Sequence, residues 1–493
     1  MKVTDFIGNK YKSWSAGDMV SIASGTGSGK SYFVQNVLAE YAKQNGELIL
    51  YLVPRKKLKE QIEAKLKKEG ITNITVKMYQ TVEAKCNNHG NNNGWLEVYK
   101  YIVCDESHYF TNDANFNDYT DMSLKHLLST SHAITLFLSA TGETLLNYVK
   151  RFYKERKLIK YPDEYPLSQD YGFVGNLSAY QSDEQLYKAM DWLLKNNYKT
   201  MVFIQSDRRA YQLFKKYEQH ATFVCGVNSD YVEFVDNEKV DTIVNEERFE
   251  TLFLIATSAL DVGVNIVDLD VQHIIIDMLD TDTFLQCLGR KRLSDEVEEK
   301  VRLLFKNYSN IQLGGYISKE AERVKSGKLF YGTVKSTKGK HTKLSDIFYI
   351  DSSGNVKVNN MKYVKAAVNL ISYQKYVQKP NGYLEEIKSL MDYQEKIYIR
   401  DYLEDKNAKL AILEENIDNK FSSEEAKELL EKLFLKNSKT KKVIKSISTA
   451  NREMVILGYP YEFIESKEYI IDSNGQKKQR RIYTLHRVRQ NSL

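Results

Sequence analysis

The chain has 493 residues, of which 42% are apolar and 28% charged, with only 5 prolines. This composition excludes a disordered or collagen-like chain, and at roughly 150 residues per domain the length predicts two or three domains. The formal net charge of +6 is unevenly distributed, because residues 436–493 contain 13 Lys and Arg against 5 Asp and Glu. Such a basic segment favours contact with a polyanion, although many basic tails are only solvated surface.

The cysteines and the N-terminal residues indicate a cellular location. The chain has 4 cysteines, with no CxxC spacing among them, so we expect no zinc site, no iron–sulfur cluster and no disulfide framework. The first residues, MKVTDFIGNK, contain no apolar signal segment, and no stretch reaches the roughly 18 apolar residues of a membrane span. A reducing, cytoplasmic location without membrane contact is the expectation.

Residues 19 to about 140 alternate short apolar runs with longer amphipathic ones. The apolar runs include VSIAS, LILYLV, ITVKMY, YIVCD and AITLFLSA. Near-continuous apolar strands separated by helices are typical of a parallel sheet covered on both faces. The sequence therefore predicts an α/β domain here.

A glycine-rich loop, SGTGSGKS, follows the first of these strands at residues 24–31 and precedes a helix. It fits the phosphate-binding pattern GxxxxGK[ST] except at Ser24. Glycines let backbone N–H groups converge on phosphate oxygens, a lysine neutralises the phosphates, and a serine hydroxyl can ligate Mg²⁺. The predicted ATP-binding residues of this loop are Gly25, Thr26, Gly27, Ser28, Gly29, Lys30 and Ser31.

An acidic pair ends another predicted strand, in YIVCDESH. We expect Asp105 to hold Mg²⁺ together with Ser31, and Glu106 to polarise the attacking water. This pair favours an ATPase that hydrolyses ATP over a kinase that transfers phosphate.

A second α/β series begins near residue 199 with TMVFIQS and ends with the helical FLQCLGRKRL. Between the two series, residues 151–198 include KYPDEYPLS, which holds two of the five prolines and indicates a linker. Beyond residue 310, IFYIDSSGNVKVNN predicts a hairpin around Ser353 and Gly354, and a long helical stretch follows over 361–437. The last segment predicts two helices and a hairpin joined by Ser473-Asn474-Gly475, the order of a small winged-helix-like module.

The combination of SGTGSGKS, DESH and SAT (residues 139–141) resembles the superfamily 2 helicases, specifically the DExH group of DEAD/DEAH-box-like proteins. Further stretches extend the resemblance in family order: VPRKKLKEQ (53–61) as motif Ia, YQT (79–81) as Ib, VFIQS (202–206) as IV, ATSALDVGVNI (256–266) as V and QCLGRKR (286–292) as VI. The short extension before the loop and the QxxGRxR form are similar to helicase-like proteins of bacteria, phages and mobile elements.

The resemblance implies two tandem RecA-like domains with parallel sheets, ATP and Mg²⁺ between them, and a nucleic-acid strand across both. It implies catalytic roles for Gln286, Arg290 and Arg292 beside Lys30 and the acidic pair, and places Gly263 and Asn265 near the nucleotide. His108, Ser139 and Thr141 would couple the ATP site to the strand. Candidates for phosphate-backbone contacts are Arg55, Lys56, Thr81, Ser206 and Thr257, since basic and hydroxyl groups suit such contacts.

Two features depart from the family pattern. The second arginine of motif VI comes one position early, as Arg292, and Leu293 occupies the usual place. No clear adenine-recognition motif precedes the loop, where Trp14 could stack on a base or lie in the core.

The expected division is 1–160 and 161–312 for the two RecA-like domains, 313–435 for a hairpin and helical accessory region, and 436–493 for the basic module. Three hypotheses remain open. The chain is a DNA helicase, an RNA helicase or remodelling ATPase, or an initiator or defence component whose ATPase works as a switch. Its C-terminal region could contact nucleic acid or dock a replication or defence partner.

Overall fold

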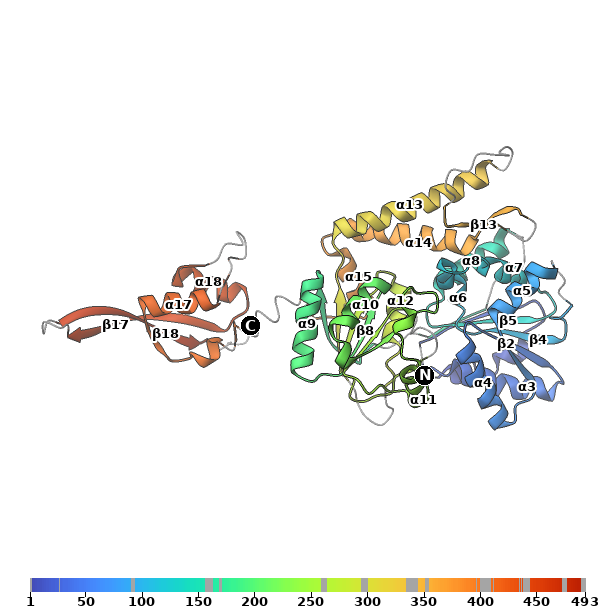
Figure 1. Ribbon diagram of the computed structural model, residues 1–493, viewed down its shortest axis with the longest axis horizontal. Coiled ribbons are helices and arrows are strands. Elements are labelled where there is room, and N and C mark those ends of the chain that lie inside the picture. Colours follow the sequence, from blue (N-terminus) through green and yellow to red (C-terminus); the bar gives the residue numbers. More distant parts are fainter. Residues whose placement is uncertain are drawn as a thin grey trace. The chain divides into compact units, whose positions relative to one another are not determined.

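The computed structural model describes most of the chain in two units, residues 1–397 and 398–493 (Figure 1). The described residues are 2–25, 27–89, 94–155, 163–167, 171–258, 264–293, 300–333, 345–350, 354–395, 397–399, 409–410, 412–433, 435, 437, 444–471 and 477–488. Each unit is considered by itself.

The first sheet consists of parallel strands in the order β3-β2-β4-β5-β1-β6. Its strands are β1 (Met19–Ala23), β2 (Leu48–Val53), β3 (Ile74–Met78), β4 (Tyr99–Cys104), β5 (Ile134–Ser139) and β6 (Asp163–Pro166). Every apolar run predicted as a strand between residues 19 and 140 forms one, which confirms the predicted α/β fold class.

Strand β2 shows why continuous apolar runs were required. Ile49, Tyr51 and Val53 belong to the apolar core on one face of the sheet. Leu50 and Leu52 belong to the core on the other. Because successive side chains of a strand point to opposite faces, both faces are covered.

The helices of this first half lie on both sides of its sheet (Figure 1). They are α1 (Val3–Ile7), α2 (Lys30–Tyr32), α3 (Ala39–Gln44), α4 (Lys56–Glu69), α5 (Tyr79–His89), α6 (Tyr109–Asn112), α7 (Thr120–Leu128) and α8 (Glu143–Glu155). A π-helical segment, Phe33–Leu38, joins α2 to α3.

The prediction of a linker over 151–198 is wrong in part. Residues Asp163–Pro166 form β6, which pairs with β1 at the edge of the first sheet. Proline lacks an N–H donor but is tolerated in an edge strand, so two prolines misled the interpretation. The same interval also contains β7 (Val174–Tyr180) and α9 (Asp183–Lys195), which belong to the second half.

The second sheet places parallel strands in the order β7-β12-β11-β8-β10-β9. They are β7, β8 (Thr200–Ile204), β9 (Ala221–Val224), β10 (Phe253–Ala256), β11 (His273–Asp277) and β12 (Val301–Lys306), with helices α9, α10 (Asp207–Lys216), α11 (Asn237–Glu246) and α12 (Thr281–Leu288). Apolar cores again lie on both faces. Two tandem parallel sheets of this kind have the RecA-like architecture that the resemblance implied.

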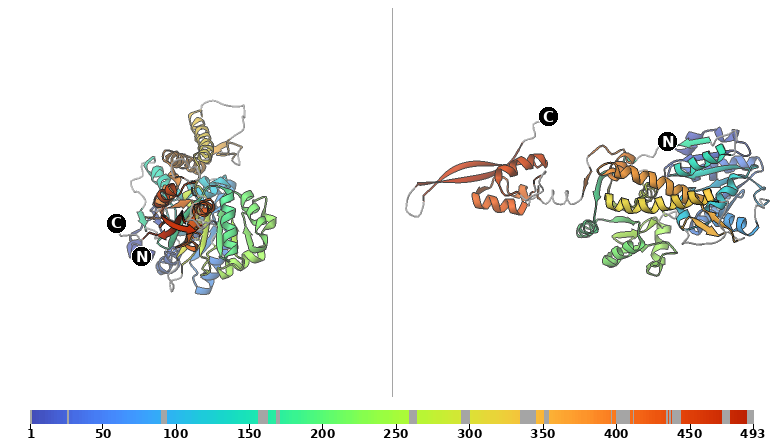
Figure 2. Two further views of the ribbon diagram at one scale, coloured as in Figure 1. Left: turned by 90° about the vertical axis from the view of Figure 1, so that its left-hand side faces the viewer. Right: turned by 90° about the horizontal axis from the view of Figure 1, so that it is seen from above.

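Three helices and a hairpin complete the first unit. The helices are α13 (Asn310–Thr333), α14 (Asn360–Val377) and α15 (Gly382–Leu390), and the antiparallel hairpin is β13 (Phe348–Ile350) with β14 (Val356–Val358). The hairpin confirms the prediction around Gly354. Helices α13 and α14 lie side by side (Figures 1 and 2).

The second unit contains helices and a small antiparallel sheet. Helices α17 (Ser423–Leu433) and α18 (Ile447–Ile456) accompany a sheet of order β16-β18-β17, formed by Lys420–Ser422, Lys477–Arg487 and Tyr461–Ile471. The two long strands form the predicted hairpin, whose turn at Ser473-Asn474-Gly475 lies outside the described residues.

All four cysteines are free thiols. Among the residues that the structure describes, no helix has the length and apolar character needed to span a bilayer.

Candidate nucleotide and nucleic-acid sites

The glycine loop lies between β1 and α2, as predicted, with Thr26 outside the described residues. Gly27 (φ 78°) and Gly29 (φ 93°) adopt the left-handed backbone conformation that glycine tolerates best. The ammonium of Lys30 is buried and donates hydrogen bonds to the carbonyls of Ser24 (2.6 Å) and Gly25 (3.0 Å). The loop thus holds its own lysine, and burial lowers the pKa of Lys30.

Ser24, which replaces the usual glycine, is accommodated without disturbing the loop. Its hydroxyl shares a 2.8 Å hydrogen bond with the hydroxyl of Ser28. Its backbone N–H donates to the carbonyl of Ser139 at the end of β5 (3.0 Å). The serine therefore closes the loop and ties it to the neighbouring strand.

The acidic pair follows β4 at the same edge of the sheet. The hydroxyl of Tyr51, on β2, donates to Oδ2 of Asp105 (2.7 Å), and the N–H of Glu106 donates to Oδ1 (3.0 Å). The Tyr51 hydroxyl also interacts with Ser31, so this phenol lies beside both predicted metal ligands. Burial, together with the neighbouring Glu106 carboxylate, raises the pKa of Asp105 to about 6.

Glu106 has a φ of 48°, in the left-handed region that non-glycine residues rarely adopt. Such conformations cost roughly 1–3 kcal/mol and occur preferentially at functional sites. Burial opposes ionisation of this carboxyl, but the positive charges of His108, Arg290 and Lys30 lower its pKa overall. The carboxylate of Glu106 is thus ready to accept a proton.

A chain of polar contacts leads from Glu106 to the SAT segment. Nδ1 of His108 lies 3.4 Å from Oε2 of Glu106 and 3.2 Å from Oγ of Ser139. The same hydroxyl of Ser139 accepts a hydrogen bond from the N–H of Thr141 (3.1 Å). These three residues are the ones predicted to couple the ATP site to the strand.

Gln286 connects the two α/β halves. It lies on α12 of the second half, and its side-chain amide donates to Oγ1 of Thr141 in the first (2.7 Å). Its carbonyl accepts from the amide of Asn112, on α6 (3.2 Å). The sequence analysis missed Asn112, since nothing in its neighbourhood resembles a motif.

Arg292 lies against the glycine loop. A Cβ placed on Gly27 would be 3.5 Å from Nη1 of Arg292. The Nε of Arg292 donates to Asn265 (2.8 Å), whereas its buried Nη1 has no hydrogen-bond partner among the described residues. Burial, together with the nearby charge of Arg290, lowers the pKa of Arg292 to about 10. A buried guanidinium N–H directed at a glycine loop suits an anion.

Arg290 is almost completely buried and lies close enough to act electrostatically on Glu106 and Lys30. Gly263, the other predicted residue of motif V, lies outside the described residues. The structure therefore brings together all the described residues that were predicted for catalysis.

The five predicted nucleic-acid contacts follow the carboxyl ends of four strands. Arg55 forms an ion pair with Asp113, and the exposed Lys56 lies 3.7 Å from Glu60. Thr81 is half-buried in the first turn of α5, Ser206 caps α10 by accepting from the N–H of Arg209 (3.4 Å), and Thr257 is buried after β10.

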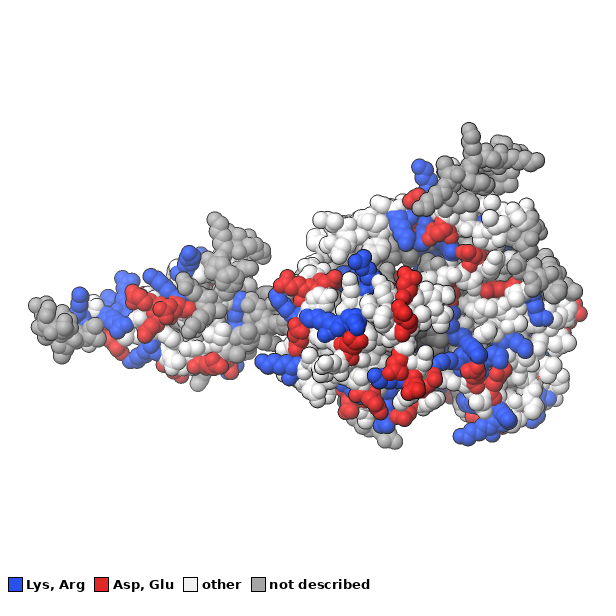
Figure 3. Space-filling view, viewed as in Figure 1, with Lys and Arg blue, Asp and Glu red and all other residues white. Residues whose placement is uncertain are grey.

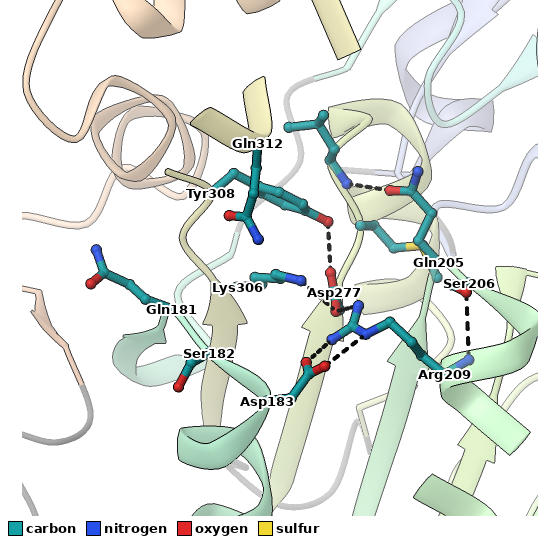
Figure 4. Close-up of polar contacts among 12 residues, drawn as sticks. Gln181, Ser182, Asp183, Gln205, Ser206, Arg209, Asp277, Lys306, Tyr308 and Gln312 are labelled. Atoms are coloured by element: carbon teal, nitrogen blue, oxygen red, sulfur yellow. Dashed lines mark hydrogen bonds and ion pairs between the residues drawn. The ribbon is translucent and has the colours of Figure 1, made fainter. Parts of the chain in front are cut away.

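A second charged cluster lies beside Ser206 (Figure 4). At its centre is the buried carboxylate of Asp277, which accepts from the hydroxyl of Tyr308 (2.6 Å) and lies 3.5 Å from the ammonium of Lys306. Arg209 bridges Asp277 and Asp183. Because Asp277 ends β11, the cluster fixes the start of the connection to α12.

Comparisons with known proteins place these features in context. Residues 9–90 match the family model described as DEAD/DEAH box helicase. No match was found among curated protein sequences.

Several solved structures are similar to the chain. S. cerevisiae Dbp5 bound to RNA and ADP BeF3 is 15% identical, over 59% of this chain and 79% of that chain, with a TM-score of 0.42. The DEAD-box helicase Mss116 bound to ssRNA and UDP-BeF is 14% identical, over 69% and 74%, with a TM-score of 0.46. The Mycobacterium smegmatis helicase Lhr bound to ssDNA and AMP-PNP is 13% identical, over 82% and 55%, with a TM-score of 0.42.

Proposed function

We propose that the chain is an ATP-dependent nucleic-acid helicase or translocase of the DExH group, with DNA as the favoured substrate. The observation that carries this proposal is the contact of Gln286 and Arg292, from the second α/β half, with Thr141 and the glycine loop of the first. A site assembled from both halves is complete only when they are together. Its occupancy can therefore drive domain motion.

The glycine loop and its surroundings fit ATP and Mg²⁺. The left-handed glycines leave room for phosphate oxygens, and Arg292 offers an unpartnered buried N–H within the described part of the chain. Lys30 would leave its loop carbonyls for the phosphates, while Ser31 and Asp105 would hold the metal. Bound Mg²⁺ would neutralise charge on the transferred phosphoryl group.

The remaining residues divide the work of hydrolysis. Glu106, whose carboxylate is kept ionised by its cationic neighbours, would position and deprotonate the attacking water. Arg290 and Arg292 would stabilise the charge that develops on the phosphate. Through Ser139, His108 would transmit the state of this site to Thr141 and Gln286.

Nucleic acid would cross both halves at the carboxyl ends of their strands. Arg55, Lys56 and Thr81 would contact the backbone from the first half, and Ser206 and Thr257 from the second. Arg55 would then exchange its ion pair with Asp113 for a phosphate. In Figure 3, Lys and Arg side chains gather over the region of α4, which begins at Lys56.

The second unit supplies a further candidate surface for nucleic acid. In the β17–β18 ribbon, Lys467 pairs with Arg481 and Tyr469 pairs with Gln479, so these side chains share one face. Lys477 lies on the same face, and the ring of Tyr469 is 69% exposed. Cations beside an exposed aromatic ring suit phosphates and bases together. We name this surface, Lys467, Tyr469, Lys477 and Arg481, the ribbon face.

Two alternatives stay open. The predicted backbone contacts carry no base or sugar information, so an RNA helicase or remodelling ATPase uses the same residues. An initiator or defence component with a switch-like ATPase would also need the two-sided site. It would not need processive unwinding.

Strand-displacement assays distinguish these functions. We expect ATP-dependent displacement on duplex DNA with a 3′ or 5′ single-stranded tail, and less on RNA or hybrid duplexes. Lys30→Ala and Glu106→Gln should abolish it. Displacement restricted to RNA would establish the RNA alternative, and nucleic-acid-stimulated hydrolysis without displacement would establish the switch.

A further inference from the structure

Helix α14 contacts the first α/β half through its N-terminal end. Met361 is fully buried in the apolar core on one face of the first sheet. Asn359 caps the helix, and its amide donates to the carbonyls of Asn117 (3.2 Å) and Asp118 (3.0 Å). Lys362 adds an ion pair to Asp118 (2.6 Å). This end of α14 is therefore fixed to the first half by packing and by polar contacts.

The next turn of α14 contacts the second half. The side chain of Lys365 is only 6% exposed, and its ammonium lies 2.7 Å from Oδ2 of Asp280 and 3.1 Å from Oδ2 of Asp282. Asp280 is the N-cap of α12, where Oδ1 accepts from the N–H of Thr283 (2.9 Å). A cation from the accessory region is thus buried against the first turn of the helix that carries Gln286.

The rest of α14 and α15 holds the same connection from another side. Tyr373 and Tyr376 pack in the apolar core of the second half. On α15, the hydroxyl of Tyr383 donates to the carbonyl of Met278 (2.5 Å). Met278 lies between β11 and α12, two residues before Asp280. The start of α12 is therefore held by both accessory helices.

A buried lysine is costly unless its charge is paired, and an apolar residue would often stabilise such a position as well or better. The paired charges instead define one position for the helix N-terminus. We propose that Lys365 is a positioning residue for the ATP site, because it fixes the first turn of α12 to a helix anchored on the first half. This proposal rests on the proposed ATPase function.

The consequence concerns Gln286 and Arg290. Both follow the held turn of α12, and their contacts with the first half depend on where that turn lies. When the two halves separate during turnover, α14 must either move with one of them or loosen at Lys365. The accessory region therefore influences how readily the ATP site assembles.

The test compares Lys365→Met with Lys375→Met. Lys375 lies on the same helix but pairs with Glu386 of α15 through an exposed side chain, so it controls for loss of a lysine from α14. Two measurements are needed: steady-state ATP hydrolysis with tailed duplex DNA, and backbone hydrogen exchange resolved by segment. If Lys365→Met does not fold, Lys365→Met with Asp282→Asn takes its place, because it removes one of the buried charges left behind.

For Lys365→Met we expect kcat to fall about tenfold with little change in KM for ATP, because the displaced groups act mainly in the transition state. Exchange should rise in Thr281–Leu288 and stay unchanged in Asp207–Lys216 of α10. Lys375→Met should match wild type in both measurements. Unchanged kcat and exchange in the Lys365 variant, or equal losses in both variants, would overturn the proposal. The exchange result stands even if the wild-type chain hydrolyses no ATP, so failure of the proposed function is recognised separately.

Discussion

The side-chain amide of Gln286 donates a 2.7 Å hydrogen bond to the hydroxyl of Thr141, and this bond joins the two α/β halves. Thr141 belongs to the segment that contacts His108 through Ser139, and His108 lies beside Glu106. A continuous polar path therefore runs from the proposed general base in one half to the motif VI helix in the other. The proposed coupling of hydrolysis to domain motion depends on this path.

Gln286→Ala should slow hydrolysis more than it weakens ATP binding. The variant loses both cross-domain hydrogen bonds, each worth about 1 kcal/mol net, so kcat should fall roughly tenfold. Steady-state kinetics with saturating nucleic acid would measure this. Gln312→Ala, at a position outside the site, is the matched control. An unchanged kcat for Gln286→Ala would remove this contact from the mechanism.

Arg292→Ala should lower kcat at least as much as Arg290→Ala. The guanidinium of Arg292 lies against Gly27, and arginines that stabilise a transferring phosphoryl group contribute roughly 10³-fold or more. Single-turnover hydrolysis separates this effect from ATP binding. The exposed Arg208 provides a control variant, Arg208→Ala. If Arg292→Ala keeps wild-type rates while Arg290→Ala does not, only Arg290 has the proposed role.

Asp105→Asn should stabilise the protein at neutral pH while abolishing hydrolysis. Burial raises the pKa of Asp105 to about 6 from a model value of 3.8, so keeping the carboxylate ionised in the folded state costs about 3 kcal/mol. This cost is fully present above the folded pKa and disappears as pH falls toward the unfolded value. The gain in Tm should therefore be largest at pH 7.5 and vanish near pH 4. Thermal unfolding across this range checks it, and a gain that grows toward acid would contradict it.

Asp277→Ala should destabilise the second half by about 3–5 kcal/mol, because it leaves the charges of Arg209 and Lys306 without their buried partner. Asp183→Ala removes the half-exposed partner of Arg209 and should cost less than about 1 kcal/mol. Urea unfolding measures both free energies. Equal losses for the two variants would show that the buried position of Asp277 is unimportant.

Replacing Lys467, Lys477 and Arg481 by Gln should weaken DNA binding and flatten its salt dependence. If each cation neutralises one phosphate, the slope of log K against log salt should fall by roughly 2 to 3. Lys478→Gln with Arg480→Gln changes the opposite face of the ribbon and should have a smaller effect. Equal effects of the two sets, or none, would show that the ribbon face is not the contact surface.

Much of the fold follows from local sequence. Each predicted strand of the first half is an apolar run bounded by turn residues, and a run buried on both faces has little freedom to be anything else. The edge strand Asp163–Pro166 was missed because it is short and contains prolines, features that also describe loops.

The site shows a similar division. The glycine loop and the acidic pair could be predicted because their chemistry requires particular residue types at close spacing. Asn112 and Lys365 could not, since their roles depend on partners distant in sequence: Asn112 meets Gln286 174 positions later. Arg292 departs from the family spacing, yet the backbone places its guanidinium at the loop. Only the three-dimensional arrangement identifies such residues.

The central claim is that one ATP site is completed by both halves when nucleic acid is bound. Its most direct test is the rate of ATP hydrolysis by the wild-type chain with and without tailed duplex DNA, alongside Lys30→Ala. The account predicts strong stimulation by DNA in the wild type and no hydrolysis by Lys30→Ala in either condition. Hydrolysis that is indifferent to DNA and RNA alike, or full activity of Lys30→Ala, would contradict it.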